Sequence, residues 1–160
     1  MKIRVGFGYD VHKLGENEEL WIGGIKIEHT KGSIGHSDGD VLIHAICDAL
    51  LGAANLRDIG FHFPDTDPNL KGIDSKLLLA KTMVLIRDAG YELGNIDSTI
   101  ALEQPKLKNL IPSMQETLAE VMAISIDDIA IKATTSEKLG FVGKQEGIAA
   151  YASVLISKNQ

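Results

Sequence analysis

The sequence has few aromatic residues, one cysteine and no long apolar run. Aromatic residues make up 5% of the chain and the formal net charge is −6. Both the basic footprint and the stacking side chains of a nucleic-acid-binding protein are therefore missing. Cys47 is the only cysteine, so no disulfide can form within the chain, which suits a reducing compartment. No run approaches the roughly 18 apolar residues of a membrane span. We therefore expect no nucleic-acid partner and no membrane partner.

Length and composition are those of one ordinary globular domain. Hydrophobic residues make up 44% and charged residues 24% of the 160 positions, and we expect residues 1–160 to form a single domain with a buried core. The residues after Met1 alternate at once like a strand, which leaves no room for a targeting peptide. We therefore expect a cytoplasmic location. An acidic chain that binds an anion also needs metal ions or a local basic site.

The order of apolar patterns predicts an α+β fold. Strands are expected over 2–9, 20–28, 94–103, 129–134 and 148–157, and helices over about 41–52, 74–89 and 112–123. The second strand should pair with the first, and 55–72 should be an irregular binding loop. This order predicts a two-layer sandwich, a mixed β-sheet with helices on one face. The other face needs a partner, and a closed cyclic oligomer is expected from the few charges on Ile148, Ala150, Ala152 and Val154.

The segment 35–52 and the end of the first strand carry candidate metal ligands. On the central helix His44 and Asp48 share one face, and Asp48 either orients His44 or faces solvent. Asp10 and His12 leave the first strand on the same face if the chain stays extended there. Asp10, His12 and His44 form an Asp/His/His set, and three ligands with one open position are typical of a catalytic zinc. From these residues alone, a chance combination remains the alternative.

Two further segments are suited to phosphate. His36 and Ser37 precede the central helix, whose N-terminus favours anions. The segment 132–143 follows a strand with hydroxyl groups, a carboxylate and a lysine, which suits a phosphate held with a hard ion such as Mg²⁺. A strand end followed by a helix cap is the alternative interpretation. Together with the zinc set, these segments suggest two metals and a polyphosphate.

Five motifs occur in order across nearly the whole chain. They are G-Y-D-V-H at 8–12, G-H-S-D-G-D-V-L-I-H-A-I-C-D-A-L-L-G-A at 35–53, D-I-G-F-H-F-P-D-T-D-P at 58–68, Q-P-K-L at 104–107 and K-A-T-T-S-E-K-L-G-F-V-G at 132–143. In sequence and spacing they closely resemble the 2-C-methyl-D-erythritol 2,4-cyclodiphosphate synthase family of the non-mevalonate isoprenoid pathway.

The resemblance implies a cyclising phosphorus–oxygen lyase. The implied substrate is 4-diphosphocytidyl-2-C-methyl-D-erythritol 2-phosphate, whose 2-phosphate attacks the β-phosphorus and expels CMP. A phosphate nucleophile is already ionised at neutral pH and needs no general base, so positioning and charge neutralisation can suffice. The implied cofactors are one Zn²⁺ per subunit on Asp10, His12 and His44, and Mg²⁺ or Mn²⁺ held with the substrate diphosphate by Glu137.

The resemblance also implies the substrate contacts. His36 and Thr135, with Ser37, would steady the charge on the transferred phosphoryl group. The implied substrate-binding residues are Asp10, Val11, His12, His36, Ser37, Asp58, Ile59, Gly60, Phe63, Pro64, Asp65, Thr66, Asp67, Leu102, Glu103, Gln104, Pro105, Lys106, Leu107, Lys108, Thr134, Thr135, Ser136, Glu137, Phe141 and Lys144. Residues 58–60 and 63–67 would hold the methylerythritol end, and 102–108 with 134–137 the cytidine. The family forms homotrimers with active sites between subunits.

One segment departs from the family pattern, and two other functions remain open. The chain has G-K-Q-E-G at 143–147 where the family often has G-R-G-E-G, so Lys144 keeps the charge but lacks the bidentate fork of arginine. Phe141 and Lys144 match residues that line a cavity on the trimer axis, where family members can hold an isoprenoid diphosphate. The alternatives are a zinc-dependent phosphohydrolase and a non-enzymatic nucleotide- or isoprenoid-binding oligomer with a structural metal. A fourth ligand, with His62 and Cys47 as the spare candidates, would favour the latter.

Overall fold

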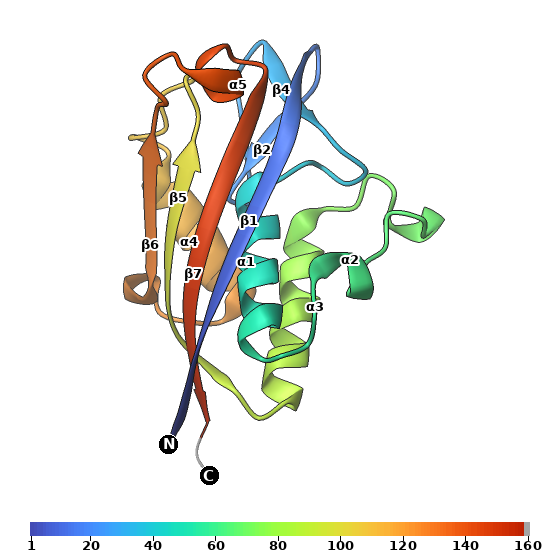
Figure 1. Ribbon diagram of the computed structural model, residues 1–160, viewed down its shortest axis with the longest axis vertical. Coiled ribbons are helices and arrows are strands. Elements are labelled where there is room, and N and C mark those ends of the chain that lie inside the picture. The colour runs from blue at the N-terminus through green and yellow to red at the C-terminus, as the bar shows by residue number, and fades with distance from the viewer. Residues whose placement is uncertain (159–160) are drawn as a thin grey trace.

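The computed structural model describes residues 1–158 and contains a mixed sheet with helices over one face (Figure 1). The strands of the large sheet are β1 (Lys2–Glu16), β4 (Lys31–Ile34), β5 (Glu92–Ala101), β6 (Ile129–Thr134) and β7 (Gly147–Lys158). The helices are α1 (Val41–Ala53), α2 (Ile59–His62), α3 (Ser75–Asp88), α4 (Ile111–Met122) and α5 (Gly140–Gly143). The strand order is β4-β1-β7-β5-β6, with β5 and β6 parallel and the other neighbours antiparallel. The predicted α+β fold is confirmed.

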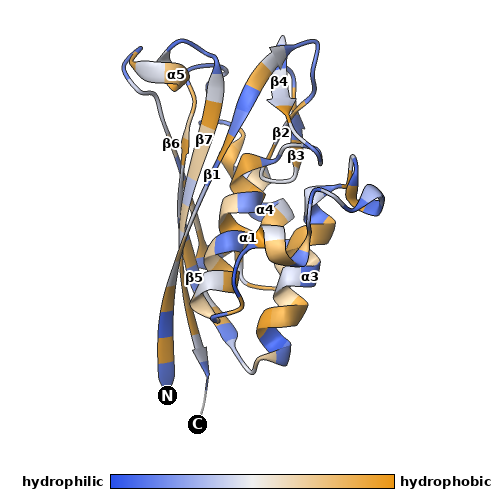
Figure 2. Cartoon of the chain, turned by 45° about the vertical axis from the view of Figure 1, so that its right-hand side comes forward, coloured by the Kyte–Doolittle hydropathy of each residue, from blue (hydrophilic) through white to orange (hydrophobic). Residues whose placement is uncertain are grey.

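Helix α1 packs directly on β1 and β7 and forms the centre of the core. It is apolar along most of its length (Figure 2), and ten of its thirteen residues are buried. Asp40 is the N-cap and accepts a hydrogen bond from the N–H of Ile43 at 3.0 Å. The helix was expected to end at Gly52 but continues to Ala53, because Ala53 still packs into the core. A Cβ atom added to Gly52 would meet no neighbouring atom.

Two glycines of β1 set the distance between α1 and the sheet. A Cβ atom added to Gly6 would lie 1.9 Å from the carbonyl oxygen of Ala49, and one added to Gly8 would lie 1.9 Å from that of Ala45. The backbone of the helix therefore rests on the backbone of the strand at both positions. This close approach brings the first turn of α1 near the residues that follow Gly8 in β1.

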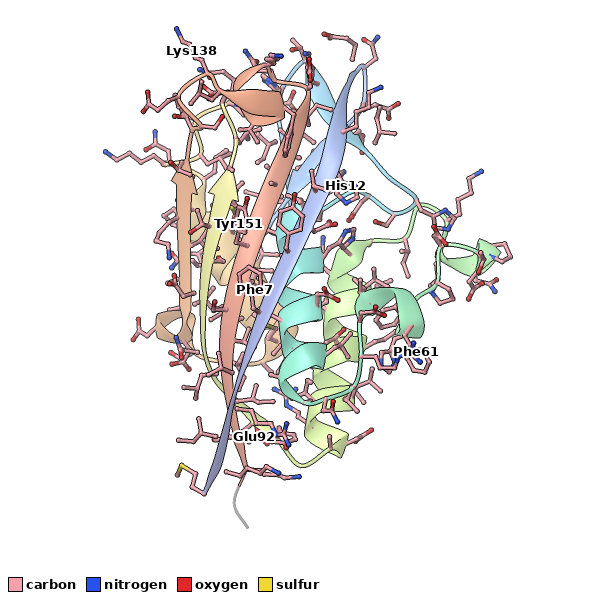
Figure 3. All side chains as sticks on the ribbon, in the orientation of Figure 1. Phe7, His12, Phe61, Glu92, Lys138 and Tyr151 are labelled. Carbon is pink, nitrogen blue, oxygen red and sulfur yellow. The ribbon has the colours of Figure 1, made fainter. Side chains whose placement is uncertain are left out.

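The face of the sheet opposite the helices is apolar along β1. Figure 3 shows Phe7 and Tyr151 on this face, and the rings of Tyr9 and Tyr151 lie 5.2 Å apart between centroids. The exposed apolar side chains here, which we call the outer face, are Ile3, Val5, Phe7, Tyr9, Val11 and Tyr151. The predicted face was wrong: Ile148, Ala150, Ala152 and Val154 are at most 2% exposed and belong to the core cluster. Alternate residues of a strand face opposite sides, and the prediction assigned β7 the wrong alternation.

Residues 20–28 form a hairpin, not the single strand that was predicted. Strands β2 (Leu20–Ile22) and β3 (Ile25–Ile27) pair with each other, and β4 takes the place beside β1 that was expected for them. Gly23 and Gly24 both have positive φ, 62° and 78°, and form the two-residue turn. Their N–H groups donate to the carboxylate of Asp40 at 3.0 and 2.7 Å, which ties the hairpin to the start of α1.

The segment 55–72 is more regular than predicted, because aspartates cap two short turns within it. Asp58 accepts a hydrogen bond from Phe61 N at the start of α2, and Asp67 accepts one from Asn69 N at the start of the 3₁₀ turn η1 (Pro68–Leu70). A second 3₁₀ turn, η2 (Ile126–Asp128), precedes β6, and the short helix α5 lies at the end of the 132–143 segment. Within residues 1–158, no helix has both the length and the apolar character needed to cross a membrane.

Candidate metal centre and substrate pockets

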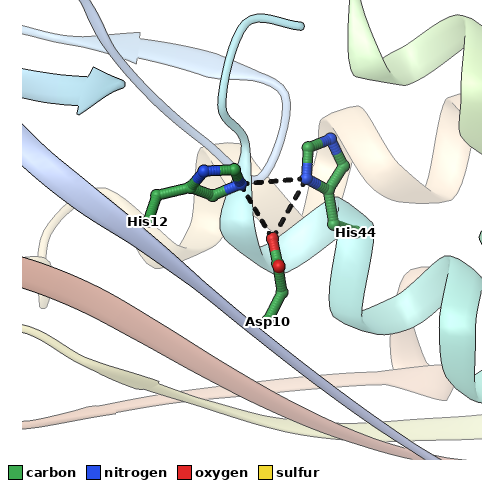
Figure 4. Close-up of side chains that lie close together, drawn as sticks. All are labelled: Asp10, His12 and His44. Atoms are coloured by element: carbon green, nitrogen blue, oxygen red, sulfur yellow. Dashed lines mark hydrogen bonds and ion pairs between the residues drawn. The ribbon is translucent and has the colours of Figure 1, made fainter. Parts of the chain in front are cut away.

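Asp10, His12 and His44 meet between β1 and α1, as the sequence predicts (Figure 4). β1 stays extended beyond Tyr9, so Asp10 and His12 both leave it on the helix side. The Oδ2 of Asp10 lies 2.9 Å from the Nε2 of His12 and 3.1 Å from the Nδ1 of His44, and the two nitrogens are 3.2 Å apart. Ligands at the corners of a tetrahedron with bonds of about 2.0 Å lie about 3.3 Å apart. The three atoms thus have nearly the spacing that a tetrahedral metal ion requires.

The outer nitrogen of each imidazole is hydrogen-bonded to the protein. The Nδ1–H of His12 donates to the carbonyl oxygen of Ile34 at 3.2 Å, and the Nε2 of His44 lies 2.9 Å from the hydroxyl oxygen of Ser75. With the hydrogen kept on each outer nitrogen, the inner nitrogens would present lone pairs to a metal ion at the centre of the cluster. Such an arrangement is typical of metal-binding histidines, and the donor set fits a metal ion.

Neither spare candidate supplies a fourth ligand. The metal-binding cluster found among residues 1–158 contains only Asp10, His12 and His44. Cys47 is buried in the core, where burial raises the pKa of its thiol to about 12. The Nε2 of His62 donates to the carbonyl oxygen of Leu56 at 2.7 Å. The described residues therefore form a three-ligand site with an open position rather than a closed structural site.

Hydrogen bonds within the cluster shift two pKa values. Burial by itself raises the pKa of Asp10, but hydrogen bonds from His12 and His44 outweigh it and lower that pKa to about 2. Burial lowers the pKa of His12, but the hydrogen bond and charge of Asp10 outweigh this and raise it above its ordinary value. At neutral pH Asp10 is ionised, and a metal ion competes with a proton for His12.

A pocket of about 430 Å³ opens beside the three ligands. Of the predicted substrate-binding residues, it brings together Asp10, His12, His36, Ser37, Ile59, Gly60, Phe63 and Asp65. The chain 63–73 is held close to His36, whose carbonyl oxygen accepts from Gly72 N at 2.8 Å and whose Nε2 donates to the carbonyl oxygen of Asp67 at 3.4 Å. The pocket combines polar groups beside the ligands with an apolar wall of Leu70, Ile73 and Leu78, which sequence reasoning did not assign.

A second pocket, of about 320 Å³, lies at the ends of β5 and β6. It is lined by the predicted residues Leu102, Pro105, Lys106, Leu107, Lys108, Thr134 and Thr135, with Ile111 and Ala133. The carboxylate of Glu103 accepts hydrogen bonds from the N–H groups of Ser136 and Lys138, both at 3.1 Å, and so shapes the turn that carries Glu137. Strands β7 and β5 lie between β1 and β6 in the sheet, so β1 and β6 are about 14 Å apart. No residue lines both pockets.

The other predicted residues lie at the edges of these pockets or away from them. The side chain of Val11 points to the outer face, and Phe141 and Lys144 are exposed at α5. Pro64, Thr66, Gln104 and Glu137 are exposed, and Asp58 caps α2. Asp48 neither orients His44 nor simply faces solvent, because its Oδ1 accepts a hydrogen bond from Ile59 N at 3.0 Å and so anchors α2 to α1.

Sequence reasoning missed the two residues that support His44 from behind. Ser75 is fully buried at the start of α3, next to the imidazole, and Asp38 contacts Ser75 through its carboxylate. Ser75 is 31 residues from His44 in the sequence, and its only local signal is a hydroxyl at the first position of the helix that Asp74 caps. Such a hydroxyl gives no sign of a distant histidine.

Comparison with known proteins places this geometry in a family. The family model described as YgbB matches residues 3–157. A 2-C-methyl-D-erythritol 2,4-cyclodiphosphate synthase of Parabacteroides distasonis is 71% identical over 158 residues, which cover 99% of this chain and 98% of that protein.

Solved structures give the same result. The bifunctional IspDF from Campylobacter jejuni matches with a TM-score of 0.95 and 44% identity over 99% of this chain, although the match covers 43% of that longer chain. IspF of Plasmodium falciparum, in a CDP complex, matches with a TM-score of 0.85 and 35% identity over 98% of this chain and 97% of its own.

Proposed function

The chain belongs to the YgbB family, and we propose that it catalyses the cyclisation for which its relatives are named. It converts 4-diphosphocytidyl-2-C-methyl-D-erythritol 2-phosphate to 2-C-methyl-D-erythritol 2,4-cyclodiphosphate and CMP, a step in non-mevalonate isoprenoid precursor synthesis. The observation that carries this proposal is the three-ligand cluster of Asp10, His12 and His44 beside a pocket lined by His36 and Ser37. The enzyme is thereby a cyclising phosphorus–oxygen lyase.

The reaction forms one phosphorus–oxygen bond and breaks another. An oxygen of the 2-phosphate attacks the β-phosphorus, and the bond from the β-phosphorus to the bridging oxygen breaks, so that CMP leaves with that oxygen. Asp10, His12 and His44 would hold a Zn²⁺ ion, which would supply positive charge beside a substrate phosphate oxygen. His36 and Thr135 stabilise the transferred phosphoryl group, assisted by the hydroxyl of Ser37. No water enters the products.

The two pockets would hold opposite ends of the substrate. The pocket beside the metal ligands has an apolar wall and a phosphate-binding rim, which suits the methylerythritol phosphate end. The pocket at the ends of β5 and β6 carries Lys106 and Lys108, which suits the cytidine diphosphate end, and a structural relative is described as a CDP complex. Glu137, next to this second pocket in sequence, would hold the Mg²⁺ or Mn²⁺ that accompanies the diphosphate.

A homotrimer would bring the two pockets together across a subunit interface. Two observations support it: one chain leaves the pockets on different strands of the sheet, and the outer face exposes a row of apolar side chains. Phe7 is 65% and Val5 71% exposed, and an interface between copies would remove both from water. Each active site would then combine the metal ligands of one subunit with the cytidine pocket of the next.

Three further features belong to the proposal, the first implied by the resemblance and the other two by length, composition and the residues after Met1. An isoprenoid diphosphate on the trimer axis would meet Phe141 and Lys144, which are exposed at α5. The chain would act as one domain over residues 1–160, and a cytoplasmic location stays a prediction.

The experiment that tests the proposed function follows the substrate by phosphorus NMR. The purified protein is incubated with the diphosphocytidyl substrate and Mg²⁺, with and without a zinc chelator. We expect the two coupled signals of a cyclic diphosphate together with CMP, their loss on chelation, and their return with added Zn²⁺. Open-chain phosphates as the products would instead establish the phosphohydrolase, and unchanged substrate would contradict both enzymatic functions.

A further inference from the structure

Behind the metal cluster, the imidazole of His44 meets two hydroxyl groups. Its Nε2 lies 2.9 Å from the Oγ of Ser75 and 3.2 Å from the Oγ of Ser37. Ser75 is fully buried at the first position of α3, whereas Ser37 is half-buried and lines the pocket beside the metal ligands. One N–H can make a strong bond to only one of them, so the surroundings of each hydroxyl decide which is the partner.

Ser75 is held rigidly by a carboxylate. Its Oγ–H donates to the Oδ1 of Asp38 at 2.5 Å, and its backbone N–H donates to the Oδ2 of the same group at 2.9 Å. Asp38 is fixed in turn, because its Oδ1 also accepts from Asp40 N at 3.1 Å and its own N–H donates to the carbonyl oxygen of Ile73 at 3.2 Å. The carboxylate thus joins the starts of α1 and α3.

The hydrogens of this chain of contacts can be assigned without ambiguity. An ionised carboxylate can only accept, so the hydroxyl hydrogen of Ser75 points to Asp38 and its lone pairs point to His44. The Nε2 of His44 must then carry a hydrogen and donate it to Ser75, so that with a metal ion bound Nδ1 would be the nitrogen that presents its lone pair beside Asp10 and His12. Since Nε2 already has a hydrogen, the hydroxyl of Ser37 has no acceptor there and keeps its own hydrogen free for the pocket.

We propose that Ser75 is the positioning residue of this metal centre: it fixes the tautomer and orientation of His44 and leaves the Ser37 hydroxyl hydrogen free to bind a phosphate oxygen. The second half rests on the proposed function, whereas the first concerns metal binding alone. Outer partners of metal-binding histidines typically contribute about 10- to 100-fold to metal affinity. Ser75 does not touch substrate and acts only through His44.

The test measures the Zn²⁺ affinity of the metal-free full chain by competition with a chromophoric chelator, so no substrate is needed. Ser75→Ala should weaken Zn²⁺ binding about 10- to 100-fold. Ser75→Thr keeps the hydroxyl and should bind Zn²⁺ with the affinity of the parent protein. Ser37→Ala should leave Zn²⁺ affinity within about twofold of the parent, although its hydroxyl is only slightly farther from His44. Thr82→Val is the matched control, because it removes another fully buried hydroxyl of α3, one that donates to the carbonyl oxygen of Leu78.

A second variant and a spectroscopic signal keep the test decisive if Ser75→Ala does not fold. Asp38→Asn removes the charge that takes the Ser75 hydrogen while it keeps the side-chain shape, and it should also weaken Zn²⁺ binding. In the zinc-loaded parent, NMR should show a slowly exchanging Nε2–H on His44, and Ser37→Ala should retain it. Unchanged affinity in Ser75→Ala and Asp38→Asn, or an equal loss in Ser37→Ala or Thr82→Val, would overturn the assignment. Failure of the cyclisation assay alone would contradict the proposed function and leave these affinities informative.

Discussion

Gly8 and Ala45 touch backbone to backbone, since a Cβ on Gly8 would lie 1.9 Å from the carbonyl oxygen of Ala45. Ala45 follows His44 in α1, and Asp10 follows Gly8 by two residues on the same side of β1. The distance between helix and strand at this contact therefore sets the distance between the ligands they carry. The three candidate metal ligands can come this close because Gly8 has no side chain.

Gly8→Ala is predicted to damage both stability and metal binding. The added methyl must push α1 away from β1, and overpacking of this kind costs about 1–3 kcal/mol. Chemical unfolding should show that loss, and Zn²⁺ affinity should fall because His44 moves with the helix. Gly52→Ala is the matched control. Gly52 lies in α1, the helix that packs on Gly8, and an added Cβ there meets no neighbouring atom, while alanine favours the helix. A Gly8→Ala protein with normal Zn²⁺ affinity would contradict this account of the site.

Zn²⁺ affinity is predicted to rise with pH. The raised pKa of His12 means that its ion pair with Asp10 stabilises the metal-free protein fully below pH 6.5 and is lost as pH rises through the pKa in the folded state. On the acid side, the lowered pKa of Asp10 means that the stabilisation from this ion pair is lost only as pH falls from 3.8 to about 2. Zn²⁺ must displace the His12 proton, so its dissociation constant should fall about tenfold per pH unit and then level off above that pKa.

Asp10→Asn provides the control for the pH dependence. It removes the carboxylate that raises the pKa of His12. This variant should bind Zn²⁺ more weakly, and its Zn²⁺ affinity should level off at a lower pH than that of the parent protein. Chelator competition across neutral pH measures both proteins. An affinity that does not change with pH in the parent would show that His12 is not protonated in the metal-free site.

Phe7→Lys is predicted to separate the subunits of the proposed homotrimer. A lysine in the middle of the outer face places a charge where the proposed interface buries an apolar ring. Sedimentation should show a folded monomer that still binds Zn²⁺ but no longer cyclises substrate. The control is Leu77→Lys, which makes the same change at a 55% exposed apolar residue of α3, away from the sheet, and should leave the trimer intact. A fully trimeric Phe7→Lys protein would argue against the outer face as the interface.

Mixed trimers are predicted to recover activity from two inactive parents. One parent carries Asp10→Asn at the metal centre and the other carries Lys106→Ala with Thr135→Ala at the second pocket. If each active site joins two subunits, every mixed trimer has one intact site of three, and random mixing should restore about a quarter of the activity. Co-expression followed by the cyclisation assay measures this. Mixed trimers, verified by mass spectrometry, that stay inactive would place each whole site within one subunit.

The metal ligands could be predicted because each follows from a local rule. Alternation along β1 places Asp10 and His12 on one side, and the apolar pattern of 41–53 predicts the helix that carries His44. The helix boundaries near Pro112 and Gly90 also follow from local chemistry, since Pro112 lies in the first turn of α4 and Gly90 has a positive φ after α3.

The features that the sequence did not predict depend on contacts between distant residues. The side of β7 that faces the helices, with Ile148 and Val154, is set by its register with β1 and by its packing against α1. The Gly23–Gly24 turn was a visible hairpin signal that the strand prediction passed over. Ser75 supports His44 only because α3 packs beside α1, and neither segment encodes that contact alone.

Cyclisation and hydrolysis differ in the source of the oxygen that attacks phosphorus, and an isotope label distinguishes them. The reaction is run with metal-loaded protein in water enriched in a heavy oxygen isotope, and both products are analysed by mass spectrometry. We expect neither the cyclic diphosphate nor CMP to contain the label, because the 2-phosphate of the substrate supplies the attacking oxygen and no water is consumed. Label in either product would show that the metal centre of Asp10, His12 and His44 directs water to phosphorus, and the protein would then be a hydrolase.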